Sequence, residues 1–169
     1  MERKINQDEF WMREALKEAE KALKKKEVPV GAVVVHQNKI IGKGYNQIET
    51  LKDATAHAEI LAIGAASNYL DSWRLTDASI YVTVEPCIMC AGAIILSRVD
   101  KLVFGAYDPK AGACESLYNL PQDIRLNHQV KIISGVLEEQ CKSIIKAFFD
   151  RLRKSEEITE ENEKRYEKT

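Results

Sequence analysis

Two cysteines separated by two residues, Cys87 and Cys90, have the type and spacing for metal or redox chemistry. Residues three apart on a helix share a face, so both sulfur atoms can reach one metal ion. Pro86 precedes them and suits the first turn of a helix, where the helix dipole lowers thiol pKa values and favours thiolate ligands. The spacing therefore predicts a chelating pair.

A third ligand is expected, because a catalytic zinc site takes three protein ligands and leaves one position for water. The sequence has only three histidines. His57 lies in the first turn of a predicted apolar helix, whereas His36 falls in a predicted turn and His128 in a loop. We therefore assign His57 to the metal and expect one zinc ion per chain. Two thiolates and a neutral imidazole would balance the charge of that ion.

Glu59 follows His57 by two residues, and a carboxylate in an otherwise apolar helix is costly unless it has a partner. Water at the open position of the metal site would be such a partner, which predicts a general acid or base. Residues i and i+2 on a regular helix do not point the same way. The spacing alone thus leaves open whether both side chains meet at the metal.

Two other interpretations of these residues stay open. Cys-x-x-Cys is also a redox motif, although a redox pair would leave His57 and Glu59 unexplained. A closed structural zinc site would take its fourth ligand from Cys114, Cys141 or His128.

The elements that must position these side chains alternate between strands and helices. An amphipathic helix is predicted over residues 8–26, with Asn6 and Glu9 as its capping pair; its apolar face is Met12, Leu16, Ala19 and Leu23. Strands are predicted over 28–35, 40–46, 79–84, 101–105 and 130–133, and helices over 56–66, 89–96 and 138–153. This order predicts a three-layer α/β/α domain with a central mixed five-stranded sheet.

The composition of the 169 residues is that of one ordinary globular domain, which we expect to span residues 1–154. Residues 155–169 are too polar to bury much, so a frayed helix or a disordered tail is predicted. The net charge of −1 excludes a nonspecific polycation, so any RNA contact must be local. No apolar run approaches the roughly 18 residues of a membrane span, and no signal-type apolar core is present, which predicts a cytoplasmic protein without membrane contact.

The segment 55–59 (TAHAE) followed by 85–90 (EPCIMC) resembles the signature of the zinc nucleobase deaminases. Within that superfamily the chain is similar to the bacterial tRNA-specific adenosine deaminases over nearly its whole length. The segments that carry this likeness are 27–32, 44–46, 90–93, 104–112, 126–128 and 134–137. The family commonly has Asp-Pro-Thr-Ala-His, and Ala54 replaces the proline here, which should alter loop stiffness but not the ligands.

The resemblance implies a cytidine-deaminase-like fold, a zinc-dependent homodimer, and hydrolytic deamination of wobble adenosine to inosine in the anticodon loop of an arginine tRNA. It gives Glu59 the role of moving protons from water to the ring nitrogen and the departing ammonia. It also implies the contacts to the target base and its neighbours. These are the side-chain amide of Asn46, the backbone around Ala58 and Glu85, the side chains of Asp108 and Lys110, and Asn127 in a matching loop.

The final predicted helix carries a further candidate RNA surface. Phe148 and Phe149 can stack on splayed bases, while the neighbouring basic residues can meet phosphates. Those basic residues are Lys142, Lys146, Arg151, Arg153 and Lys154. A solvated charged face over core aromatics is an equally good interpretation of this spacing.

Two rival functions use the same residues. A free guanine, cytosine or nucleoside deaminase would share the zinc chemistry and differ only in its pocket, so the catalytic residues do not separate it from an RNA deaminase. A non-enzymatic zinc-stabilised RNA-binding module is disfavoured, because it gives Glu59 no role.

Overall fold

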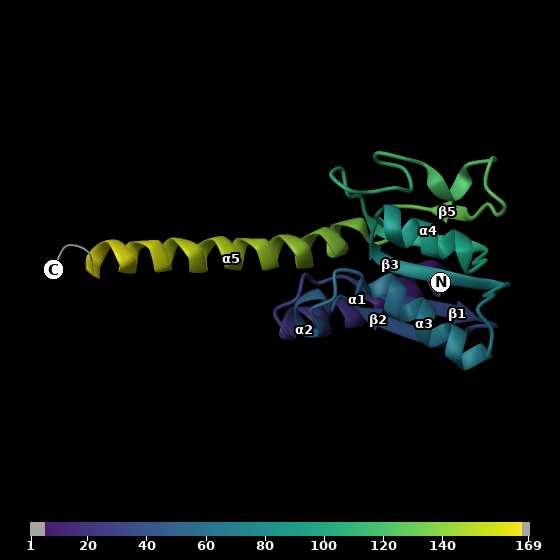
Figure 1. Ribbon diagram of the computed structural model, residues 1–169, viewed down its shortest axis with the longest axis horizontal. Helices are drawn as coiled ribbons and strands as arrows, with labels where there is room; N and C mark the ends of the chain where they lie inside the picture. The colour runs from purple at the N-terminus through teal and green to yellow at the C-terminus, as the bar shows by residue number, and fades with distance from the viewer. Residues whose placement is uncertain (1–5, 167–169) are drawn as a thin grey trace, which may run out of the picture.

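The computed structural model describes the backbone of residues 6–166 and the side chains of residues 6–155. Five strands form one sheet in the order β2-β1-β3-β4-β5 (Figure 1). They are β1 (Gly31–His36), β2 (Lys39–Tyr45), β3 (Ala78–Val84), β4 (Lys101–Ala106) and β5 (Lys131–Ile133). Strand β1 is antiparallel to β2 and β3, whereas β3, β4 and β5 run parallel. The predicted mixed five-stranded sheet is confirmed.

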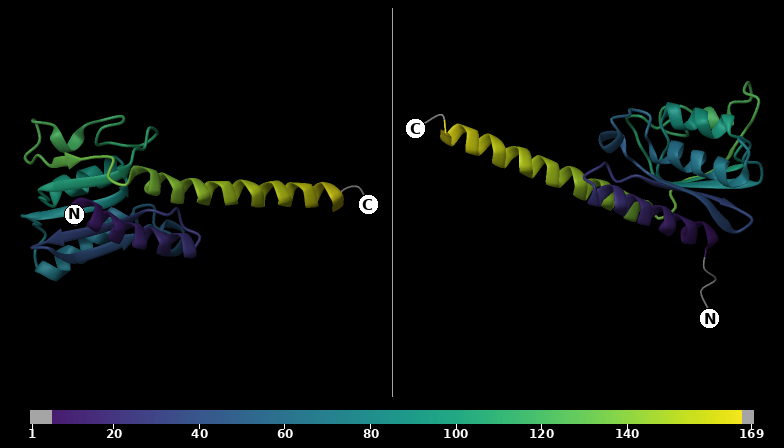
Figure 2. Two further views of the ribbon diagram at one scale, coloured as in Figure 1. Left: turned by 180° about the vertical axis from the view of Figure 1, so that it is seen from behind. Right: turned by 60° about the horizontal axis from the view of Figure 1, so that its bottom comes forward.

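Helices cover both faces of the sheet (Figures 1 and 2). Helices α1 (Gln7–Lys24) and α5 (Glu138–Tyr166) pack on one face, and α3 (Ala58–Leu70) and α4 (Ile88–Leu96) on the other. Successive strand residues point to opposite faces, so Val34 and Val82 join the core under α3 and α4 while Val33 and Tyr81 join the core under α1 and α5. The three-layer prediction is also confirmed. Two short helices, α2 (Ile48–Leu51) and η1 (Leu120–Gln122), were not predicted.

Helix α1 begins after Asn6, whose side chain accepts a hydrogen bond from the backbone N–H of Asp8, as expected of a capping residue. Its buried face differs from the prediction: Trp11, Met12, Ala15, Ala19 and Ala22 are buried, while the predicted Leu16 and Leu23 are only half-buried. The reason is a close approach to the sheet. A Cβ at Gly31 would lie 2.1 Å from the carbonyl oxygen of Ala15, so alanines occupy the contact and leucines flank it.

Helix α3 approaches β2 equally closely. A Cβ at Gly44 would lie 2.2 Å from the carbonyl oxygen of Ala58, and one at Gly42 would lie 2.3 Å from that of Ala62. Any larger residue at these two positions would push the helix off the sheet. The glycines of β2 therefore fix where α3 begins, which matters because the candidate site lies at that end.

Several element boundaries differ from the predictions for physical reasons. Strand β1 begins at Gly31 rather than at residue 28, because Pro29 has no N–H for the ladder. Helix α3 begins at Ala58 rather than at residue 56. Helix α5 continues past residue 153, where the prediction ends it, through Tyr166, and it extends away from the sheet (Figure 1). Residues 167–169 of the predicted tail lie outside the described part of the chain.

None of the helices within residues 6–166 combines the length and the apolar character needed to cross a membrane.

Asp8 joins the start of α1 to the sheet. One carboxylate oxygen accepts hydrogen bonds from the Tyr81 hydroxyl and the Lys101 ammonium, both at 2.8 Å. Burial raises the pKa of Asp8, but the hydrogen bonds from Lys101 and Tyr81 outweigh it, so the pKa lies below its ordinary value. A lowered folded-state pKa stabilises the protein above the unfolded-state pKa, and this stabilisation is lost as the pH falls through the folded-state pKa.

We expect Asp8→Asn to lower the free energy of unfolding by about 1–2 kcal/mol at neutral pH, because an uncharged amide oxygen replaces the charged acceptor of the hydrogen bonds from Tyr81 and Lys101. At a pH below the folded-state pKa of Asp8, the variant and the wild type should differ much less. Urea denaturation followed by circular dichroism at both pH values measures this. An equal loss of stability at the two pH values would show that the charge of Asp8 is not what stabilises the helix.

Candidate active site

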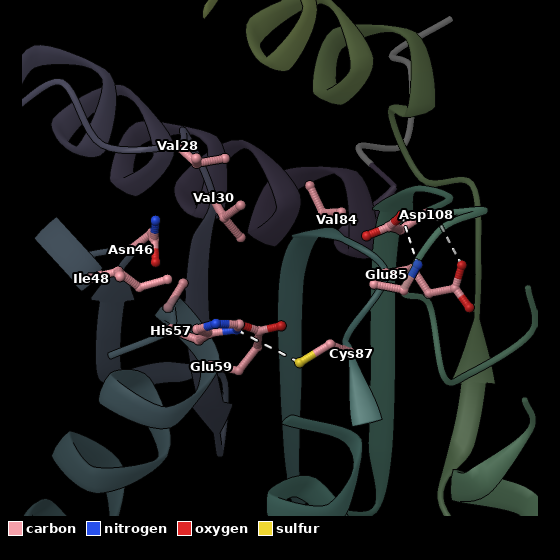
Figure 3. Close-up of a pocket in the computed structure, with 12 residues that line it drawn as sticks. Val28, Val30, Asn46, Ile48, His57, Glu59, Val84, Glu85, Cys87 and Asp108 are labelled. Carbon is pink, nitrogen blue, oxygen red and sulfur yellow. Dashed lines mark hydrogen bonds between the residues drawn. The ribbon is translucent and has the colours of Figure 1, made fainter. Parts of the chain in front are cut away.

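The candidate site lies at one end of the strands of the sheet, where β2, β3 and β4 end and β1 begins. Helices α3 and α4 begin at the same end of the sheet, so the positive ends of their helix dipoles point toward the site. Figure 3 shows the result: His57, Glu59 and Cys87 lie close together, with Asn46 on one side of them and Glu85 with Asp108 on the other. The predicted catalytic and ligand residues are therefore neighbours.

His57 is the N-cap of α3 rather than a residue of its first turn, which corrects the predicted helix start. Its backbone is extended (φ −75°, ψ 153°). The direction of the His57 side chain is therefore not set by helical geometry. The rule that residues i and i+2 of a helix point different ways does not apply to His57 and Glu59. His57 and Glu59 both face the cavity.

Cys87 and Cys90 sit at the start of α4 as the spacing predicts. Cys87 is the N-cap, and its carbonyl accepts the backbone N–H of Ala91 at 2.8 Å, while Cys90 lies in the first turn and is buried. Pro86 precedes the N-cap rather than occupying the first turn. The N-caps of two helices thus supply two of the three predicted ligands.

The ligand atoms of His57, Cys87 and Cys90 all lie within 4.8 Å of one another. His57 Nδ1 is 3.7 Å from Cys87 Sγ and 3.5 Å from Cys90 Sγ. Tetrahedral zinc with ordinary bond lengths places nitrogen and sulfur ligands about 3.6 Å apart, so the group has the dimensions of a zinc site. Among residues 6–155, this is the one cluster of at least three histidine, cysteine or acidic side chains close enough to share a metal ion.

The fourth ligand of a closed structural site is missing from this cluster. His128 Nε2 is 2.7 Å from the carbonyl oxygen of Val99, and Cys114 faces the carbonyl of Pro86 at 3.8 Å. Cys141 belongs to the core on the other face of the sheet. Within the described side chains the cluster therefore has three ligands and an open side, as a catalytic site does.

The electrostatics of the cluster suit a cation. A hydrogen bond from Cys90 and a second from His57 lower the pKa of Cys87 to about 3, whereas the hydrogen bond to Cys87 and burial raise the pKa of Cys90. The hydrogen bond to Cys87 also raises the pKa of His57. Cys90 therefore keeps its proton beside the Cys87 thiolate, and a divalent metal would supply the positive charge that lets both sulfur atoms bind as thiolates.

Glu59 is 4% exposed and lies in the first turn of α3. Burial raises the pKa of its carboxyl group, and its own backbone N–H and His57 oppose that rise. The side chain lines the cavity beside the cluster without being one of the three grouped ligands. This is the position of a group that exchanges protons with whatever the cavity holds.

The cavity has a volume of about 210 Å³, below the roughly 300–1,000 Å³ typical of sites for drug-sized ligands. Its walls are mainly apolar, with a few polar groups. The lining residues are Val28, Val30, Asn46, Ile48, His57, Ala58, Glu59, Val84, Glu85, Cys87, Asp108 and Ala111. The size and the apolar walls fit one flat aromatic base.

Asn46 is 5% exposed and lies on the cavity wall (Figure 3). Its backbone N–H bonds the carbonyl of Val30 at 3.1 Å. Within the described residues its side-chain amide has no hydrogen-bond partner. An amide offers both a donor and an acceptor, so this one is free to read the edge of a base.

Two buried glutamates shape the loops around the cavity, and the sequence analysis did not foresee their role. Glu85 accepts hydrogen bonds from four backbone N–H groups and a hydroxyl of residues 108–116, and Glu27 accepts three from residues 49–50. In each case burial opposes ionisation, but these hydrogen bonds outweigh it and lower the pKa. The side chain of Glu85 is thus occupied within the protein.

Not every residue predicted to contact the substrate lies near the cavity. Asp108 lines the cavity, whereas Lys110 is exposed and outside its wall. Asn127 is exposed and lies shortly before β5, next to His128, which contacts Val99 ahead of β4. Strands β4 and β5 are parallel and β4 ends near the cavity. Residues that precede β5 therefore lie at the opposite end of the strands from the cavity. The structure thus does not bring Asn127 to the candidate site of its own chain.

Of the two aromatic residues predicted to stack on RNA bases from α5, one is buried and one is exposed. Phe148 is only 8% exposed, so its ring does not offer a free face to a base. Phe149 is 43% exposed and meets Phe148 edge to face. Arg153 is exposed and forms an ion pair with Asp150. Phe149 and Arg153 thus stay accessible, while Phe148 belongs to the packing.

The chain is similar to one protein family, one relative of known function and two solved structures. The sequence profile of the MafB19-like deaminase family matches residues 6–153. The chain is 52% identical over 158 residues to the tRNA-specific adenosine deaminase of Bacillus subtilis (strain 168), which covers 94% of this chain and 98% of that protein. A solved structure from a study of A-to-I editing by tRNA:A34 deaminases superposes with a TM-score of 0.77 and 41% identity, over 80% of this chain and 98% of that one. A guanine deaminase from Bacillus subtilis superposes with a TM-score of 0.56 and 36% identity, over 59% of this chain and 64% of that one.

Proposed function

This chain belongs to the MafB19-like deaminase family, and from that premise we propose that it converts the wobble adenosine of a tRNA anticodon loop to inosine. The observation that carries the chemistry is the buried Glu59 carboxyl group on the cavity wall beside the His57, Cys87 and Cys90 cluster. The RNA substrate is supported by the tRNA-specific adenosine deaminase of Bacillus subtilis, which is similar over nearly the whole chain. By resemblance, the substrate is an arginine tRNA.

The reaction adds water at C6 of adenine and releases the exocyclic amino group as ammonia. Bound zinc would be held by His57, Cys87 and Cys90, one ion per chain, and would supply the Lewis acidity that makes water nucleophilic at neutral pH. Glu59 takes a proton from the attacking water and delivers protons to the ring nitrogen and to the departing ammonia. The apolar walls exclude bulk water from these transfers.

The cavity residues hold the base in place. Asn46 presents its unpaired side-chain amide to the base, and the backbone around Ala58 and Glu85 lies along the same wall. Asp108 lines the opening toward the neighbouring nucleotides. Lys110, Phe149 and Arg153 are exposed outside the cavity and would contact the RNA beyond the target base. An anticodon loop is already single-stranded, so placing one base in the cavity costs little unstacking energy.

We propose that the enzyme is a homodimer and acts in the cytoplasm on its tRNA substrate. The outer faces of α3 and α4, which lie side by side in Figure 1, support the dimer because they carry no exposed charge. Ile88 and Leu96 are 54% and 71% exposed there. A Cβ at Gly64 or Gly92 would meet nothing within 4 Å, so the fold of this chain alone does not require these glycines. A second copy packed closely on these helices would bury this face.

We expect Leu96→Asp to raise the dimer dissociation constant at least tenfold, because it places a charge on the apolar face. Sedimentation equilibrium across a range of protein concentrations measures this constant. Leu152→Asp is the control, since Leu152 is also an exposed leucine (42%) but lies on α5, on the other side of the sheet. A Leu96→Asp protein as dimeric as wild type would remove this face from the interface.

The substrate class is tested by incubating the purified protein with an anticodon stem-loop and, in parallel, with free adenosine, guanine and cytidine. Ammonia release from the stem-loop alone is the expected result. The partial similarity to a guanine deaminase makes guanine the critical comparison. Ammonia from guanine and none from the stem-loop would replace the tRNA reaction by deamination of a free base.

A further inference from the structure

The cavity lies between two loops, and each is held by one buried glutamate. The first loop, called here the α2 rim, comprises Asn46 and the following residues through α2, of which Asn46 and Ile48 line the cavity. The second, called the 108–116 rim, contributes Asp108 and Ala111. Figure 3 shows Ile48 and Asp108 on opposite sides of the cavity. Neither rim contains a residue of the metal cluster.

Glu27 holds the α2 rim. It is 2% exposed, and one carboxylate oxygen accepts the backbone N–H of Thr50 at 2.6 Å and the Thr50 hydroxyl at 2.7 Å. The other oxygen accepts the backbone N–H of Glu49 at 3.2 Å. Helix α2 has only four residues and no side-chain cap of its own. Glu27 therefore satisfies N–H groups that a capping side chain would otherwise bind.

Glu85 holds the 108–116 rim. It is 3% exposed, and its Oε1 accepts the backbone N–H groups of Cys114, Glu115 and Ser116 at 2.7–3.1 Å. Its Oε2 accepts the backbone N–H of Asp108 at 3.1 Å and the Ser116 hydroxyl.

Glycine at position 112 makes room for this arrangement. A Cβ at Gly112 would lie 2.3 Å from the Glu85 carboxyl carbon, so the loop packs directly on the carboxylate. Glu85 is thus the main side-chain anchor of this rim, beside the backbone contacts of Gly112 with Cys87 and of Ala113 with Pro86.

We infer that Glu27 and Glu85 are positioning residues that set the distance between the two rims and thereby determine how tightly the enzyme binds its RNA substrate. The inference rests on the proposed function. The reacting groups come from the starts of α3 and α4, so loosening the α2 rim should leave them in place, whereas Gly112 of the 108–116 rim also forms a β-bridge with Cys87. Substrate binding should then weaken much more than turnover slows. Glu27 gives the cleaner test, because Glu85 is separated from Cys87 by a single residue.

The first test replaces each carboxylate by the amide of the same shape. In Glu27→Gln the amide group turns a donor toward the N–H of either Glu49 or Thr50, and in Glu85→Gln it does so toward Asp108 or residues 114–116. Losing hydrogen bonds to a charged acceptor should raise KM for the stem-loop at least tenfold. In Glu27→Gln we expect kcat to change by less than about threefold and zinc content to stay constant, since no reacting group has moved.

A second pair of variants avoids altering a buried group. Thr50 is exposed, so Thr50→Val removes one hydrogen bond to Glu27 without a change in shape, and Thr50→Ser restores it. KM should rise several-fold in Thr50→Val and return toward wild type in Thr50→Ser. Glu18→Gln is the matched control: Glu18 is also buried, but it pairs with Lys21 and Lys43 on α1 and β2 and does not line the cavity. Its KM should equal that of wild type.

The outcomes separate this inference from the proposed function. Wild-type protein that does not deaminate the stem-loop contradicts the proposed function itself. Active wild type with an unchanged KM in Glu27→Gln and Thr50→Val overturns the positioning role. A fall in kcat or zinc content without a rise in KM also overturns it, because the glutamates would then support the metal cluster and not the rims. If Glu27→Gln does not fold, the Thr50 pair decides.

Discussion

Glu59→Ala will keep its fold and its metal while losing roughly two to four orders of magnitude in kcat on an anticodon stem-loop. The reason is that a positioned proton-transfer group contributes a factor of this size, and no other carboxylate of the cavity wall is free to replace it: Glu85 is held by five hydrogen bonds and Asp108 by the N–H groups of Lys110 and Ala111. Inosine formation under single-turnover conditions gives the rate.

The stability of this variant provides an independent control. Glu59 is 4% exposed, and a buried carboxylate is costly to desolvate, so its removal should leave the melting temperature unchanged or raise it. Glu59→Gln keeps the shape of the side chain and should be as inactive as the alanine variant. A folded, metal-loaded Glu59→Ala protein with near wild-type turnover would contradict the proton-transfer role.

Cys87→Ala and Cys90→Ala should each weaken zinc binding by more than about a hundredfold, and with it abolish activity. Changes to groups that merely orient metal ligands cost up to about that much, and loss of a ligand should cost more. The wild type should retain one zinc ion per chain after dialysis against a weak chelator, as measured by elemental analysis.

The chain offers matched controls for this prediction. Cys114 and Cys141 are also buried free cysteines, but neither belongs to the cluster. Cys114→Ala and Cys141→Ala should therefore keep their zinc. Full zinc retention in both Cys87→Ala and Cys90→Ala would show that the ligand assignment is incorrect.

The part of the site that follows from local spacing could be predicted from the sequence. Cys87 and Cys90 are three residues apart at a helix start, and that geometry does not depend on the rest of the fold. The structure brings His57 together with Cys87 and Cys90, but its predicted place in the helix was wrong: apolar periodicity does not distinguish an N-cap from the first residue of a helix. The difference matters, because only an extended residue ahead of the helix can face the same cavity as Glu59.

The parts that depend on contacts between distant segments could not be predicted. Glu85 holds backbone groups 23–31 residues away, and Glu27 holds groups 22–23 residues away. No local pattern reveals such donors.

The distance of Asn127 from the cavity also depends on the fold as a whole. The loop sequence does not reveal that Asn127 precedes a parallel strand and so lies at the opposite end of the strands from the cavity. The face of α1 was misjudged because the close contact at Gly31 selects alanines over leucines.

The proposed substrate is a single adenosine, the one at the wobble position, and locating the product in the tRNA tests this most directly. A full-length arginine tRNA would be incubated with the protein, digested to nucleotides of known position, and analysed by mass spectrometry. We predict inosine at the wobble position in proportion to active enzyme, none at the other adenosines, and none with Glu59→Ala. Inosine spread over several loop adenosines, or an unmodified tRNA under conditions in which the same protein deaminates guanine, would contradict the account.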